Sequence, residues 1–234
     1  MKRNGFTLVE MIMTIIIGGI LVLGIAGFLE LGAKGYSDTV ERQRLQTQAR
    51  FVLEKISREV RHSVPNSIEV TGSTDRCVSF YPIIYSGFYS VSDANNLSLS
   101  FIVGNRDEDG NPPSSYDGLF MIINPSQQAD LTNSDLAIAL SGANSTITLD
   151  QPLASESIAN RHYIYKEMVS YCFNSTSEAI VRNSTQVADS VTDGDIVYDA
   201  PTLQRGGVVH IDVTFENDDE TTSFQQDIQV LNVP

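Results

Sequence analysis

The chain has 234 residues, with 15 Lys and Arg against 29 Asp and Glu, for a formal net charge of −14. The charge is uneven, because residues 1–62 carry a net of +3 and residues 63–234 a net of −17. So acidic a segment repels phosphate groups, which argues against nucleic-acid binding. Its length is sufficient for one domain with its own hydrophobic core.

The first thirty residues contain a long apolar run that begins after two basic residues and Gly5. The run covers residues 6–29, which is 24 residues, and its one charged side chain is Glu10. As a helix it spans ~36 Å, enough to cross a ~30 Å hydrocarbon core with some tilt. An ordinary secretory signal has a shorter apolar run of ~7–15 residues. A plain single-pass anchor fits the length but explains neither Gly5 nor Glu10, since a charge inside a membrane is costly.

The sequence G-F-T-L-V-E at residues 5–10 resembles the class III signal of type IV prepilins and pseudopilins. The resemblance implies that residues 1–5 are a leader peptide, which a prepilin peptidase removes by cutting after Gly5. It also implies that the new N-terminal residue, Phe6, is N-methylated. Glu10 matches the glutamate that the family keeps for subunit assembly.

The same resemblance implies where the protein resides and what it contacts. It predicts a bacterial inner-membrane protein that crosses the bilayer once and contacts lipid through residues 6–29. The basic residues at the start keep the N-terminus in the cytoplasm, which leaves the C-terminal domain in the periplasm. The implied partners are other major and minor pilins and an inner-membrane assembly platform, which moves the subunit into a pilus at the cell surface.

The helix is expected to continue beyond the membrane, from Phe6 to about His62. Residues 6–31 are the transmembrane or filament-core half, and residues 32–64 are the amphipathic half. In the second half, apolar residues recur at the spacing of one helical face, which must pack against the C-terminal domain. Pro65 ends the helix. This expected face consists of Leu45, Ala49, Val52, Ile56 and Val60, helped by Val40 and Phe51.

Residues 65–234 read as an exported, β-rich globular domain. Short apolar and alternating runs predict strands within residues 68–71, 77–84, 97–103, 119–123, 147–149 and 163–173. A final hairpin is predicted at residues 209–230 with a polar turn at 217–220. Segments 104–118 and 174–195 are rich in turn-forming residues and predict loops. The fold class is therefore α+β, type IV pilin-like, with one long helix packed on an antiparallel sheet and no linker that divides the domain.

The chain has two cysteines, Cys77 and Cys172. An exported domain lies in an oxidising compartment, where a disulfide between them is expected. Such a bond closes a long loop and removes unfolded-state entropy worth ~4–5 kcal/mol in the simple chain model. Two buried thiols are the alternative. The cysteines form no CxxC pair, which argues against redox catalysis.

The sequence contains no recognisable catalytic motif, and we expect that the protein is not an enzyme. The three histidines are far apart, and His162 and His210 alternate with apolar residues as packing or surface residues do. No cofactor is expected. The one candidate cation site is the calcium-loop-like sequence at Asn105, Asp107 and Asp109, where oxygen ligands alternate before a glycine. It lacks the glutamate at the twelfth position, so a solvated acidic turn is the preferred interpretation.

Three further stretches narrow the resemblance. Glu41-Arg42 and residues 51–61 are similar to the helix of minor pilins of the J/W class. Residues 64–68 and the ending at 230–234 are similar to a minor subunit of the mannose-sensitive haemagglutinin (MSHA) pilus. The alternatives are a J-type minor pseudopilin of a type II secretion system and a cell-adhesion module at the pilus tip. For the latter, the aromatic residues Tyr85, Phe88 and Tyr89 form either a sugar platform or a packed hairpin.

Overall fold

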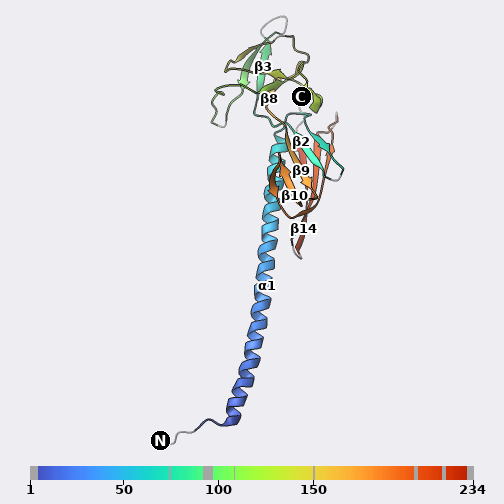
Figure 1. The fold of residues 1–234 in the computed structure, drawn as a ribbon. Helices are drawn as coiled ribbons and strands as arrows, with labels where there is room; N and C mark the ends of the chain where they lie inside the picture. The colour runs from blue at the N-terminus through green and yellow to red at the C-terminus, as the bar shows by residue number, and fades with distance from the viewer. Residues whose placement is uncertain are drawn as a thin grey trace.

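A computed structural model describes residues 5–73, 75–91, 97–107, 109–149, 151–202, 205–217 and 220–230. One long helix leads into a β-rich body, with the N-terminus at the far end of the helix (Figure 1). The elements are α1 (Leu8–Arg61), β1 (Glu69–Thr71), β2 (Cys77–Phe80), β3 (Tyr85–Val91), β4 (Ser98–Gly104), β5 (Phe120–Ile122), the 3-10 helix η1 (Gln128–Thr132), β6 (Ile138–Ala139), β7 (Thr146–Thr148), β8 (Arg161–Tyr165), β9 (Val169–Asn174), β10 (Ala179–Arg182), β11 (Thr185–Ala188), β12 (Val191–Asp199), β13 (Gly207–Asn217) and β14 (Glu220–Val230).

The predicted α+β class is confirmed, but the strands divide among three sheets instead of one. A five-stranded sheet has the order β1-β2-β9-β10-β11, a three-stranded sheet β12-β13-β14, and a six-stranded sheet β6-β5-β8-β3-β4-β7. Every strand pair is antiparallel. The loop predicted at residues 174–195 is wrong, because β10, β11 and the start of β12 lie there. Their polar composition reflects exposed strand faces, which the sequence alone does not distinguish from loops.

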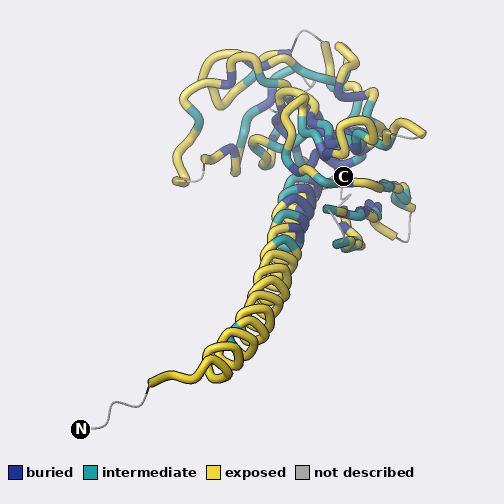
Figure 2. The backbone as a smooth tube through the Cα atoms, turned by 60° about the horizontal axis from the view of Figure 1, so that its bottom comes forward, coloured by how far each residue is buried: buried dark blue, intermediate teal, exposed yellow. Residues whose placement is uncertain are grey.

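We call the C-terminal half of α1 together with β1, β2 and β9–β14 the proximal lobe. Its core is closed by the predicted helical face, in which Leu45, Ala49, Val52, Ile56 and Val60 are 0–1% exposed. Figure 2 shows that burial on α1 is confined to this half. Each fully buried aliphatic side chain contributes ~1.5–3 kcal/mol. The expected help from Val40 and Phe51 is wrong, because they lie on the opposite side of the helix and are 45% and 62% exposed.

We call residues 81–168 the distal lobe, which contains β3–β8 and lies beyond the C-terminal end of α1 (Figure 1). Its six-stranded sheet encloses a separate hydrophobic cluster around Tyr89, Leu99, Met121 and Ile164. The predicted continuous strand over 163–173 is therefore interrupted. After β8 the chain leaves the distal sheet at residues 166–168 and enters the proximal sheet as β9.

The two lobes meet at the end of the helix. Val64, Tyr81, Leu131 and Tyr165 belong to one small buried cluster there, and Tyr165 donates its hydroxyl proton to the Leu131 carbonyl at 2.7 Å. On the proximal side of this joint, β2 pairs with β9, and Cys77 faces Cys172 in that register. These two cysteines form a disulfide, which ties together the two strands between which the distal lobe is inserted.

Candidate processing and assembly site

The predicted signal lies where extended chain becomes helix. Thr7 is the N-cap of α1, with extended backbone angles, and its side-chain hydroxyl accepts a hydrogen bond from the Glu10 N–H at 3.3 Å. Thr and Glu three residues apart form the sequence pattern of a helix start. Glu10 is the acidic residue of the first turn, where the helix dipole favours a negative charge. Thr7 thus has a structural role that the sequence pattern T-x-x-E already signals.

Gly5 and Phe6 precede the helix and are exposed, and the Phe6 ring is 77% exposed. Both residues are therefore accessible to solvent and lie outside the helix. Residues 1–4 of the predicted leader lie outside the described residues. Among the described residues, Glu10 takes part in no ion pair.

The helix that follows leaves its apolar surface uncovered along the first half. Leu8–Arg61 is the helix of the described chain that is long and apolar enough to cross a membrane, and its most apolar window has no buried residue. Its exposed residues include Ile12, Leu21, Phe28 and Tyr36. Exposed apolar surface of this extent is unfavourable in water, so this half of α1 is built for a lipid or protein environment.

Comparison with known proteins gives one match. The family described as "Prokaryotic N-terminal methylation motif" matches residues 1–26, which include Gly5, Phe6 and Glu10. No curated protein and no solved structure matches the chain. The motif supports membership of the type IV pilin and pseudopilin family, and the long N-terminal helix with antiparallel sheets is consistent with the type IV pilin-like fold. The motif is typical of structural subunits, and the apolar helix of the described chain fits anchoring in an inner membrane.

Polar contacts fix the amphipathic half of α1 against the proximal lobe. Glu59 accepts hydrogen bonds from Arg182 of β10 at 3.0 Å and forms an ion pair with Lys55 at 3.2 Å. Burial disfavours the charged form of Glu59, but the bonds from Arg182 and Lys55 outweigh it and hold its pKa below the usual value. Lys55 and Glu59 lie four residues apart, a spacing that brings two side chains together on a helix. Arg182 lies 123 residues away, and nothing in its surroundings marked it as the partner.

The calcium candidate does not gather its ligands in the structure. Asn105 is 4% exposed, and its side-chain oxygen accepts a hydrogen bond from His162 Nε2 at 2.9 Å inside the distal core. Asp107 instead caps a local turn, accepting the Asn111 N–H at 2.7 Å, and Glu108 lies outside the described residues. Over the described part of the chain, no group of three or more His, Cys, Asp or Glu side chains is placed to hold a metal ion.

The aromatic platform considered for adhesion is also not formed. Tyr89 is fully buried, and its hydroxyl accepts the Ser157 N–H at 3.1 Å. Tyr85 packs edge-on against Tyr116 in the same core, whereas Phe88 points outward and is 39% exposed. The three rings therefore lie on two faces of β3, because side chains alternate along a strand, and the packed hairpin is the reading that fits.

Proposed function

We propose that the protein is a minor type IV pilin or pseudopilin, a structural subunit for pilus biogenesis and assembly. Within this group the quoted stretches favour a minor subunit of an MSHA-like pilus, of the MshO type. The observation that carries the proposal is the methylation motif at the first turn of a membrane-length helix, followed by a β-rich body. A J-type minor pseudopilin of a type II secretion system is the second candidate, supported by the helix sequence at residues 51–61.

In this proposal, the leader, residues 1–5, lies on the cytoplasmic side of the inner membrane. Residues 6–31 anchor the subunit in that membrane, and the β-rich body lies in the periplasm. Prepilin peptidase cuts after Gly5, Phe6 is methylated, and the assembly platform lifts the helix out of the bilayer into a filament of other pilins. Glu10 is then partnered by the positive N-terminus of a neighbouring subunit. Attraction between opposite charges is strong in a low-dielectric core, which would set the register between helices.

Substitutions at Gly5 and Glu10 test the two halves of this proposal in the host cell. Changing Gly5 to Trp is expected to leave the leader attached, which mass spectrometry of the N-terminus measures directly. Changing Glu10 to Ala is expected to leave cleavage intact but to reduce incorporation into filaments by at least ~10-fold, on the scale of a lost charge pair. Glu10→Asp, which keeps the charge, is the matched control.

Two results would contradict the proposal. One is a native product that retains Met1, and the other is normal incorporation of the Glu10→Ala chain. A deletion strain separates the alternatives, because loss of pili indicates the pilus role, and loss of secretion with intact pili indicates the pseudopilin role. Intact filaments that fail to adhere would indicate the tip adhesin.

A further inference from the structure

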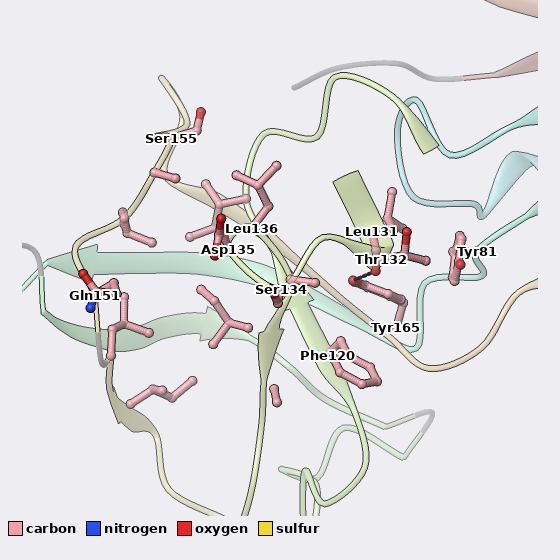
Figure 3. A pocket seen from close by; sticks show the side chains of 18 of the residues that line it. Tyr81, Phe120, Leu131, Thr132, Ser134, Asp135, Leu136, Gln151, Ser155 and Tyr165 are labelled. Carbon is pink, nitrogen blue, oxygen red and sulfur yellow. Dashed lines mark hydrogen bonds between the residues drawn. The ribbon is translucent and has the colours of Figure 1, made fainter. Parts of the chain in front are cut away.

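Among the described residues, the six-stranded sheet of the distal lobe ends in two strands that pair on one side only, and both border the same cavity. The sheet order places β6 and β7 at its opposite ends. A cavity of about 1180 Å³ is lined by Ile138 and Ala139 of β6 and by Ile147 and Thr148 of β7. Figure 3 shows this cavity, with Leu136 and Gln151 among the labelled residues that line it. Successive side chains of a strand point to opposite faces. Because the cavity is lined by two consecutive residues of each strand, it extends along the edge of both strands and does not lie against one face alone.

Backbone directions on β7 can be worked out from its hydrogen bonds. The Leu149 N–H donates to the Leu97 carbonyl at 2.7 Å, on the side where β7 pairs with β4. In an antiparallel pair, alternate residues direct their N–H and C=O groups toward the same neighbouring strand. Thr148 therefore directs its backbone N–H and C=O away from β4, toward the free edge.

The same reasoning applies to β6. The Leu140 N–H donates to the Leu119 carbonyl at 2.9 Å, next to the pair formed by Ala139 and Phe120. Ala139 consequently directs its backbone groups away from β5. Ala139 of β6 and Thr148 of β7 thus each direct a backbone donor and acceptor away from the sheet, and both residues line the cavity.

These edges also lack the charged side chains that usually prevent strand addition. β6 reads Ile-Ala and β7 reads Thr-Ile-Thr. By contrast, the edge strand β12 carries Asp193, Asp195 and Asp199, and the edge strand β14 carries Glu220 and Asp227. The uncharged edge strand β11 lies against α1. Within the described residues, the two distal edge strands are therefore uncharged and suited to pairing, and the charged residues that line the cavity, Asp135, Lys166 and Glu167, lie outside both strands.

We propose that the gap between β6 and β7 accepts an extended, uncharged segment of a partner subunit, which adds to the sheet as a further strand. Backbone hydrogen bonds to both Ala139 and Thr148 hold the segment, and its alternate apolar side chains enter the cavity beside Ile123, Leu136 and Leu153, which line it. A polypeptide is the ligand because the groups that face the gap are backbone donors and acceptors in strand geometry. That the partner is a subunit of the same assembly rests on the proposed function.

The test uses the full chain in its host cell, with a photoreactive phenylalanine analogue at Gln151. This residue lines the cavity and is exposed, outside both strands. The control probe replaces Ile158, which is fully exposed in the same lobe and does not line the cavity. After irradiation, the cross-linked peptides are identified by mass spectrometry. The Gln151 probe is expected to capture one defined segment of a partner subunit, at least ~10-fold more than the Ile158 probe does, as alternate pockets give specificity in strand addition.

Substitutions at Thr148 then ask whether backbone pairing holds the segment. Thr148→Pro removes an N–H that faces the free edge without removing a bond to β4, so it is expected to abolish the cross-link. Thr148→Val keeps the N–H and the branched shape, so the cross-link should persist. Ala139→Pro tests the opposite edge independently, in case Thr148→Pro impairs folding.

As a measurement without substitutions, hydrogen exchange of peptides spanning residues 137–149 should slow on assembly. The idea is overturned if the Gln151 probe captures no polypeptide, if capture survives both proline changes in folded chains, or if exchange at 137–149 is unchanged. Leader cleavage and incorporation are measured on the same samples. A chain that is processed and incorporated but captures nothing contradicts strand addition alone, whereas an unprocessed chain contradicts the proposed function.

Discussion

The proximal and distal lobes obtain their cores in different ways. The proximal core joins residues far apart in sequence, because the helical stripe at 45–60 packs with β13 and β14 near the C-terminus. The distal lobe is one continuous insertion between β2 and β9, and it packs its sheet without the helix. The sheet of the distal lobe is therefore packed independently of α1. The strands that α1 contacts lie in the proximal lobe, and the edge strands β6 and β7, which we propose pair with a partner, lie in the distal lobe.

The largest expected effect is a loss of stability in the proximal lobe alone, caused by a substitution in the helix that closes its core. Ile56→Ala empties a fully buried site of the proximal core and should lower the free energy of unfolding by about 2–5 kcal/mol. Phe51→Ala on the exposed side of the same helix is the matched control, with an expected change within about 0.5 kcal/mol. Hydrogen exchange by mass spectrometry of the full chain in detergent measures both. Equal loss of protection in the two lobes after Ile56→Ala would mean that they unfold as one unit.

An acid-sensitive group is predicted in the distal core. His162 is fully buried and stacks on Phe101 with ring centroids 4.6 Å apart. Burial lowers its pKa from 6.5 to about 4. Above pH 6.5 the ring is neutral in the folded and unfolded chains and has no effect. As pH falls from 6.5 to 4, the unfolded chain takes up the proton first, so the distal lobe loses about 3 kcal/mol.

Unfolding of the wild type and of His162→Gln across this pH range checks the prediction. The substitution should remove this part of the pH dependence, whereas the acid response of carboxylates elsewhere is common to both chains. A distal lobe with the same pH profile in the two chains would show that His162 does not titrate as its burial implies.

The smallest expected effect concerns His210 of the proximal lobe, whose pKa is shifted in the opposite direction to that of His162. His210 of β13 donates a hydrogen bond from Nδ1 to Asp227 at 2.7 Å, and its Nε2 lies 3.8 Å from Asp199. The bond to Asp227 raises the pKa of His210. The resulting stabilisation is present below the unfolded pKa and is lost as pH rises through the folded value. NMR titration should show a His210 pKa that falls toward its usual value in Asp227→Asn, and an unchanged pKa in that variant would exclude the pairing.

Much of the proximal lobe could be predicted from sequence because its signals are local or periodic. The stripe through Leu45 and Ile56 follows the helical repeat, and the final hairpin follows strand alternation. The motif at Gly5, Phe6 and Glu10 needs no fold to be recognised, since it lies in six consecutive residues. The roles of these residues in cleavage, methylation and assembly remain predictions that the chain's own geometry supports but does not test.

The misassigned parts depend on which strands meet. Apolar residues alternate from Tyr163 to Phe173 with Glu167 as the exception, yet β8 and β9 belong to different sheets. Asn105 fits the pattern of a cation ligand in the sequence, but in the structure its side chain is bonded to His162. Sequence by itself determined the membrane-length helix, its signal and the α+β class, because periodicity and charge act over neighbouring residues. Only the tertiary structure decided the division into two lobes, the pairing of Glu59 with Arg182 and the open edges of β6 and β7, because these depend on contacts between segments far apart in the chain.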